Sequence, residues 1–102
     1  MNLPVVTTPE ADAQIHTIDG WWRQNRTASP NSFLDELSNA FELIAQAPLL
    51  GRPYRRSPVP GMRRLFLRVT RYHVYYAVGE HDVRILAIWH GQRGVGPPLR
   101  AK

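Results

Sequence analysis

The sequence predicts an α+β fold: an N-terminal strand, an α-helical hairpin, then a three-stranded antiparallel meander, in the order β-α-α-β-β-β. Three observations indicate this class. Two segments of the N-terminal half repeat apolar residues at helical spacing, three runs of the C-terminal half are rich in strand-forming residues, and a Pro-, Gly- and Arg-rich stretch separates the halves. The chain has 102 residues, the size of one domain, so we expect a single domain over residues 1–102.

The N-terminal half is predicted to open with a short strand over residues 3–6, where β-branched residues cluster. Thr8 is a suitable N-cap for the following helix, and Pro9 suits its first position. The apolar residues of this helix share one face: Ala11, Ile15, Ile18 and Trp22. Trp21 lies off that face, which leaves open whether it is exposed for a contact or covers the edge of the hairpin.

A second helix is predicted after the turn TASPNS, with Ser29 as its cap and Pro30 as its first residue. Its apolar residues also share one face: Phe33, Leu37, Ala40, Phe41 and Ile44. Pro48 and Gly51 end this helix. Residues 49–61 hold too much proline and glycine for a helix interior or a central strand, so we expect a surface loop.

Three strands are predicted over residues 63–70, 73–78 and 83–90, with a tight turn at 79–82 that joins the last two into a hairpin. Both faces of the third strand are apolar: Val83, Ile85, Ala87 and Trp89 on one, Leu86 and Ile88 on the other. This strand should therefore lie inside the sheet, with helices on one side and other structure behind it. The tail, residues 91–102, is predicted to be irregular.

The basic residues are concentrated in the C-terminal half. Residues 1–50 carry two arginines against six carboxylates, whereas residues 51–102 carry eleven basic residues, ten of them arginine, against two acids. Arginine rather than lysine points to planar recognition of carboxylate or phosphate, although a solvated basic face gives the same count. Cysteine is absent, which excludes disulfides and thiolate zinc sites and fits a reducing cytoplasm.

No motif of the sequence indicates a metal or a cofactor. The four histidines are scattered without an HExxH motif, and no glycine-rich phosphate loop occurs. No apolar run is long enough to cross a membrane, and the opening residues lack the basic start of a secretory signal. We therefore expect no cofactor, no metal and no membrane partner, and a cytoplasmic location.

Arginine and histidine on the predicted sheet are the remaining candidates for chemistry. The segment IWHGQR places His90 and Arg93 three residues apart where the last strand ends. In a nuclease, arginine would stabilise the phosphorane charge and histidine would move protons. The candidates for that role are Arg64, Arg68, His90 and Arg93. The same residues could instead bind phosphates or an acidic protein, and His90 could simply satisfy backbone at the strand end.

Three stretches together resemble the RelE/ParE superfamily of bacterial toxins from type II toxin–antitoxin systems. They are AQAPLLGRPYRR, GMRRLFLRVTRYHVYYAV and DVRILAIWHGQR. The second is similar to the family's Gly-x-Arg strand followed by a Tyr-x-x-x-Tyr strand, and the third to its closing strand with a His-Gly-x-Arg ending. Their order over most of the chain implies the same β-α-α-β-β-β fold.

The superfamily divides in function between ribosome-dependent mRNA nucleases, the RelE branch, and inhibitors of DNA gyrase, the ParE branch. Arg93 matches the arginine that follows the last strand in the nucleases. However, His73 stands where they carry an arginine, and Leu99 stands where they often carry a tyrosine. The chain therefore resembles the ParE branch more closely, which implies a protein-binding inhibitor and not an enzyme, with the endoribonuclease as the alternative.

The resemblance also implies an antitoxin partner whose acidic, disordered C-terminal segment folds on the toxin. The basic half of the chain would attract that segment, and the helical hairpin would offer it an apolar groove. DNA would be contacted only through the antitoxin. The residues expected to bind the antitoxin or the target are Trp21, Arg55, Arg56, Arg63, Arg64, Arg68 and Arg93.

Overall fold

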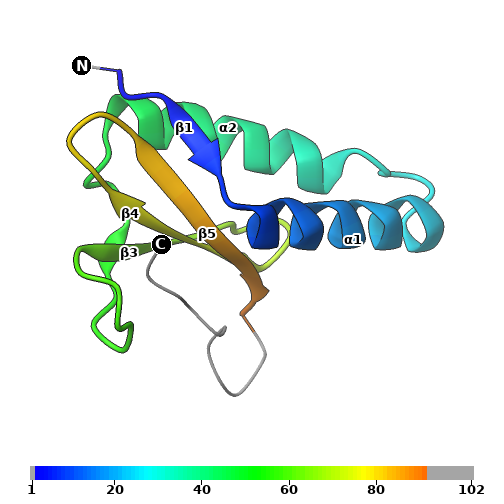
Figure 1. Cartoon of the computed structure of the whole chain (residues 1–102). Helices are drawn as coiled ribbons and strands as arrows, with labels where there is room; N and C mark the ends of the chain where they lie inside the picture. The colour runs from blue at the N-terminus through cyan, green and yellow to red at the C-terminus, as the bar shows by residue number, and fades with distance from the viewer. Residues whose placement is uncertain (1, 92–102) are drawn as a thin grey trace.

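The computed structural model of the chain describes residues 2–91. The elements are β1 (Val5–Thr7), α1 (Pro9–Asn25), α2 (Ser32–Gln46), β2 (Arg52–Pro53), β3 (Met62–Phe66), β4 (Tyr72–Val78) and β5 (Val83–His90). The strands form one five-stranded sheet of order β1-β5-β4-β3-β2 (Figure 1). β1 runs parallel to β5, and the other neighbouring strands are antiparallel. The predicted α+β class, with its helical hairpin and its antiparallel meander β3-β4-β5, is confirmed.

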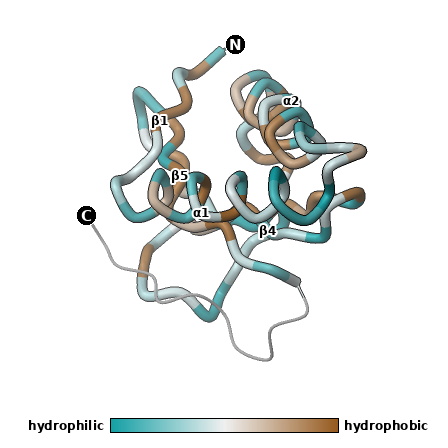
Figure 2. The backbone as a smooth tube through the Cα atoms, turned by 90° about the vertical axis from the view of Figure 1, so that its right-hand side faces the viewer, coloured by the Kyte–Doolittle hydropathy of each residue, from teal (hydrophilic) through white to brown (hydrophobic). Residues whose placement is uncertain are grey.

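The sheet separates two apolar clusters. Both helices lie on one face of the sheet, as the side view of Figure 2 shows. On that face α2 buries Phe33 and Ile44, and α1 buries Ala11, against a core that includes the β4 and β5 side chains. The opposite face holds a smaller cluster: Met62, Tyr75, Leu86 and Ala87, with Tyr54 and Val59 of the loop before β3 packed against it. β5 therefore has apolar groups on both sides, as predicted.

The start of α1 follows the sequence signals closely. The hydroxyl oxygen of Thr8 accepts a hydrogen bond of 3.2 Å from the amide of Ala11, and Pro9 is the first helical residue. The Thr8 side chain thus satisfies one of the amides that an α-helix leaves unpaired at its N-terminus.

The prediction that Ser29 caps the second helix with Pro30 as its first residue is wrong. α2 begins at Ser32, and the amide of Ser32 donates to the carbonyl of Ser29 at 3.2 Å. Pro30 therefore occupies the second position of a tight turn, where its fixed φ angle is also favoured. The same local signal, serine followed by proline, serves a turn as well as a helix start.

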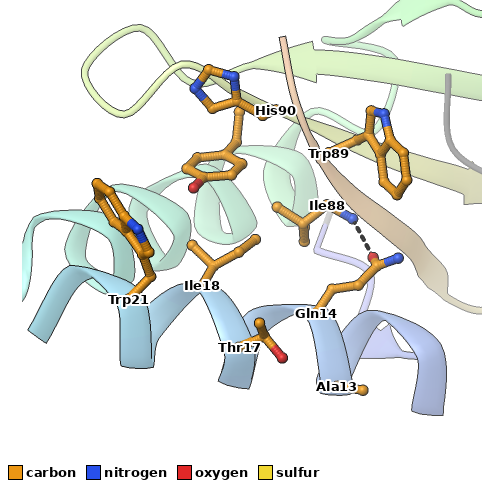
Figure 3. A pocket seen from close by; sticks show the side chains of 9 residues that line it. Ala13, Gln14, Thr17, Ile18, Trp21, Ile88, Trp89 and His90 are labelled. Carbon is orange, nitrogen blue, oxygen red and sulfur yellow. Dashed lines mark hydrogen bonds between the residues drawn. The ribbon is translucent and has the colours of Figure 1, made fainter. Parts of the chain in front are cut away.

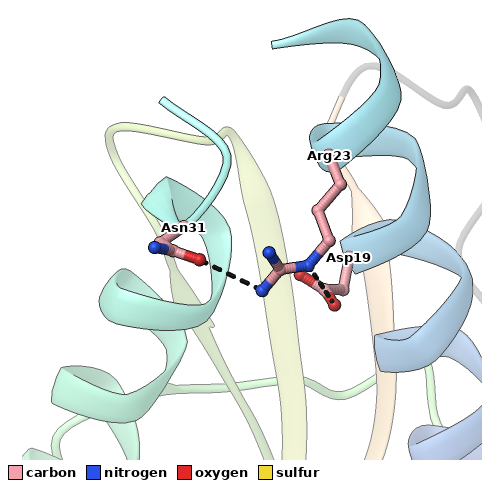
Figure 4. Close-up of polar contacts among 3 residues, drawn as sticks. All are labelled: Asp19, Arg23 and Asn31. Atoms are coloured by element: carbon pink, nitrogen blue, oxygen red, sulfur yellow. Dashed lines mark hydrogen bonds and ion pairs between the residues drawn. The ribbon is translucent and has the colours of Figure 1, made fainter. Parts of the chain in front are cut away.

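The side chain at the N-cap of α2 contacts the other helix and does not cap α2. Asn31 takes the N-cap position of α2, but its side-chain oxygen accepts a hydrogen bond of 3.0 Å from the Arg23 guanidinium (Figure 4). Arg23 also pairs with Asp19 at 3.1 Å, one turn earlier on α1. The cap residue is therefore used to hold the end of α1 beside the start of α2.

The predicted strand over residues 63–70 is wrong in its second half, because β3 ends before residue 67. Residues 67–71 form a tight turn, in which the amide of Arg71 donates to the carbonyl of Leu67 at 2.8 Å. A carboxylate from a distant element supports this turn, since Glu36 of α2 accepts hydrogen bonds from two of its backbone amides. The alternation of apolar and polar residues along the sequence cannot reveal a contact with a distant carboxylate, and so it predicted too long a strand.

A β-bulge at Leu86 shifts the faces of β5. Ala87 pairs with Tyr75, whereas Ile85 pairs with the next residue of β4, so Leu86 has no partner in this register. Beyond the bulge the alternation moves by one residue, and Ile88 joins Ile85 in the helix-side core while Ala87 lies in the opposite cluster. The predicted grouping of these side chains is wrong, because a strict period of two does not allow for a bulge.

Two short strands complete the edges of the sheet. Within the predicted surface loop 49–61, β2 pairs with β3, and Pro53 is tolerated there because β2 is an edge strand. At the other edge β1 covers residues 5–7 instead of the predicted 3–6, because its partner β5 pairs with those three residues. The predicted tail lies outside the described residues apart from Gly91.

Candidate functional site

A groove of about 600 Å³ lies between α1 and the C-terminal half of β5 (Figure 3). Its lining is Ala13, Gln14, Thr17, Ile18, Trp21, Tyr72, Ile88, Trp89 and His90. The groove arises because β1 pairs with β5 only as far as Ile85, so that the rest of this β5 edge has no neighbouring strand within the described residues. The side chain of Gln14 accepts a hydrogen bond of 2.8 Å from the amide of Ile88 on that edge. An apolar wall beside an open strand edge can receive a peptide as a helix or as an added strand.

Trp21 is a half-exposed wall of this groove. Its side chain rises from α1 toward the groove in Figure 3, and the residue is 45% exposed. The ring meets Trp22 edge-on at 5.8 Å, and the Arg26 guanidinium lies 5.3 Å from its centroid. Of the two alternatives left open by the sequence, the structure thus has Trp21 accessible at the groove.

The opposite face of the sheet carries a cluster of aromatic and basic side chains. The Arg64 guanidinium lies 5.5 Å from the centroid of Tyr54, and Tyr54 meets Tyr75 edge-on at 4.9 Å. Burial raises the pKa of Tyr75 above its usual value, while its hydrogen bond with the Arg64 side chain opposes that shift. Arg64 is therefore held by the ring of Tyr54 and the side chain of Tyr75, and it stays half-buried on this face of the sheet.

His73 continues this cluster toward the end of the sheet. Its ring lies 4.9 Å from Phe66 and 6.1 Å from Tyr75. Burial lowers the pKa of His73 below 6.5, and the electrostatic effects of the nearby Arg64 and His90 lower it further. The imidazole is therefore mainly neutral at pH 7, and its buried Nδ1 has no hydrogen-bond partner among the described residues.

The nuclease candidates do not converge in the part of the chain that the structure describes. The ring of His90 meets Tyr72 edge-on at 5.0 Å, and both residues line the groove on the helix side. Arg64 lies on the opposite face, and Arg68 lies in the turn after β3. Arg93 lies outside the described residues.

Three further arginines expected to bind a partner have different surroundings. Arg55 and Arg56 are exposed in the loop between β2 and β3. Arg63 is engaged in holding the chain, because its guanidinium donates to the carbonyl oxygens of Gly51 and Leu49 at 2.6 and 3.1 Å. The first two are open to a partner, whereas Arg63 also serves the fold.

Sequence reasoning missed two polar residues of the helices that reach distant backbone, Gln14 and Glu36. No local pattern marks either residue, because each one's partner is a strand or turn far along the chain. Within residues 2–91, no three His, Asp or Glu side chains gather as a metal site, and no helix is long and apolar enough to cross a membrane.

Comparison with known proteins decides the family. Residues 5–95 match the family model described as "ParE toxin of type II toxin-antitoxin system, parDE". The chain belongs to the ParE toxin family. A solved structure titled "Chromosomal ParDE TA system from P. aeruginosa" has the same fold, with a TM-score of 0.68 and 21% identity over 86% of this chain and 95% of that one. No curated protein sequence matches the chain. The resemblance to the ParE branch that the sequence suggested is thus confirmed.

Proposed function

We propose that this ParE-family toxin arrests bacterial growth by inhibiting DNA gyrase in the cytoplasm, and that its antitoxin neutralises it by direct binding. The observation that carries the proposal is the position of His90. Its ring packs against Tyr72 in the groove, whereas Arg64 lies on the opposite face of the sheet. Because these two side chains lie on opposite faces of the sheet, we interpret the His-Gly-x-Arg ending as part of a protein-binding surface.

We propose that the groove beside α1 is the binding site of the antitoxin. Its walls offer Ile18, Trp21 and Ile88 to the apolar side of a folding segment, whereas an extended segment would have to displace Gln14 from the Ile88 amide to pair with the edge of β5. The excess of arginine in residues 51–102 would attract an acidic segment and speed its association.

Induced expression of the chain, with parallel pulse labelling of DNA and protein synthesis, tests the target. We expect labelled thymidine incorporation to fall first, while labelled methionine incorporation continues. A fall of protein synthesis before DNA synthesis would contradict the proposal. Coexpression of a short neighbouring reading frame that encodes an acidic-tailed protein should restore growth, which tests the antitoxin.

An endoribonuclease is the second candidate, because one cluster of side chains favours it. His73, Tyr75 and Arg64 share a face of the sheet, and the lowered pKa of His73 leaves a neutral imidazole that can accept a proton at pH 7. If this cluster cleaves mRNA on ribosomes, His73→Ala should lower the cleavage rate roughly 100-fold. An absence of cleavage by the wild-type chain on purified ribosomes would exclude this candidate.

A further inference from the structure

We infer that the turn between β3 and β4, residues 67–71, is the surface with which this toxin contacts its protein target. The partner that fits it is a protein surface with an apolar socket bordered by carboxylates. The inference rests on the proposed function, because it assigns the turn to the target and leaves the groove beside α1 to the antitoxin.

The turn presents an apolar side chain that the fold does not use. Val69 is 72% exposed, the largest value among the exposed large hydrophobic residues of the described chain. It stands directly beside Arg68, which is also exposed. A single exposed valine is common on protein surfaces and does not by itself indicate a binding site. The case for Val69 therefore depends on the contacts that hold the turn in place.

The turn is fixed from behind by a carboxylate. The Glu36 side chain accepts hydrogen bonds from the amides of Val69 and Thr70 at 2.8 and 2.9 Å, and from the Thr70 hydroxyl at 2.6 Å. Hydrogen bonds to an ionised acceptor are stronger than neutral ones, and Thr70 is buried. Val69 is therefore held outward on a rigid support, and a rigid contact loses little conformational entropy when it binds.

Arg71 adds backbone strain to the same turn. Its φ angle is +72°, a left-handed conformation that residues with a Cβ atom seldom adopt. Such strain persists where the surrounding structure fixes it, and it is frequent at binding sites. The strained conformation leaves the guanidinium 5.9 Å from the ring of Phe66.

Beside the turn lies a cavity of about 330 Å³ that favours an acidic group. It is lined by Phe66, Arg71, His73 and Gly91. Neither Arg71 nor Arg68 forms an ion pair with another residue in the range 2–91, while the nearby Glu36 is occupied with the turn backbone. A carboxylate of a partner would pair with the Arg68 guanidinium beside Val69 or with Arg71 at the cavity, and this charge complementarity favours an acidic partner surface.

The double variant Val69→Ser with Arg68→Ala tests the inference, and Leu43→Ser, an exposed position on α2, is its matched control. The readouts are colony counts after induction at equal expression, and the affinities of the purified chain for gyrase and for the antitoxin. We expect the double variant to bind gyrase at least about 10-fold more weakly and to restore colony counts, with antitoxin affinity within about twofold of wild type. Leu43→Ser should leave all three unchanged.

Two results would overturn the inference. The first is a double variant that kills as well as the wild type, and the second is a double variant that loses antitoxin binding as much as target binding. A wild-type chain that arrests growth without binding gyrase would refute the proposed target instead. The comparison of colony counts then still decides whether the turn contacts whatever target the chain has.

Discussion

Removal of the Glu36 carboxylate should release the β3–β4 turn and destabilise the whole chain. In Glu36→Ala three donors lose their acceptor: the amide of Val69, the amide of Thr70 and the Thr70 hydroxyl. Hydrogen bonds to charged groups contribute roughly 1.5–3 kcal/mol each, but water can replace the acceptor at the exposed Val69. Because Thr70 is buried, its two bonds account for most of the loss, and we expect the free energy of unfolding to fall by about 3 kcal/mol.

Thermal and urea unfolding followed by circular dichroism measure this effect. For a chain of this size, about 3 kcal/mol corresponds to a fall in Tm of roughly 10–20 °C. Glu42→Ala removes an exposed carboxylate from the same helix and should leave the Tm nearly unchanged. Amide exchange at Thr70 should also accelerate in Glu36→Ala. A Tm no lower than that of the control would refute the argument that this carboxylate holds the turn.

Three other perturbations follow from the same structure. Tyr76→Phe removes a hydroxyl that accepts from the Gly51 amide at 2.7 Å, so unfolding in urea should show a loss of about 1–3 kcal/mol, and an unchanged midpoint would contradict it. Ile44→Ala opens a cavity in the core and should cost about 2–5 kcal/mol in the same assay; a cost under about 1 kcal/mol would contradict the packing. Burial lowers the folded-state pKa of His73 below the unfolded value of 6.5. Below pH 6.5 the unfolded chain therefore binds more protons than the folded chain, and stability falls as the pH falls through the folded-state pKa. His73→Gln should therefore flatten the loss of stability between about pH 7.5 and 5, and equal slopes in both proteins would refute this reading.

Local signals predicted the parts of the fold that local interactions determine. Thr8 caps α1 because a threonine hydroxyl reaches an amide three residues away, and this contact depends on the sequence of one turn alone. The bounds of β5 were also predicted, because an apolar run between two turn signals marks an interior strand. The end of β3 and the bulge at Leu86 were not, since Glu36 and the pairing with β4 determine them from a distance.

The candidate site likewise has features that the sequence indicates and features that depend on distant pairing. The position of Trp21 off the apolar face of its helix left open whether it is exposed or covers the edge of the hairpin, and the structure places it, exposed, on a groove wall. The groove itself could not be predicted, because it depends on where β1 stops pairing with β5. Arg63 looked like a free surface cation in the sequence, but its hydrogen bonds to Gly51 and Leu49 appear only once β2 and β3 are paired.

The proposed target is best tested by the supercoiling of relaxed plasmid by purified DNA gyrase, measured with increasing amounts of the purified chain. We expect supercoiling to fall as the chain is added, and mRNA on purified ribosomes to stay intact at the same concentrations. Full supercoiling activity together with cleavage of ribosome-bound mRNA would contradict the proposed target, and would move the function to the cluster of His73, Tyr75 and Arg64 on the other face of the sheet.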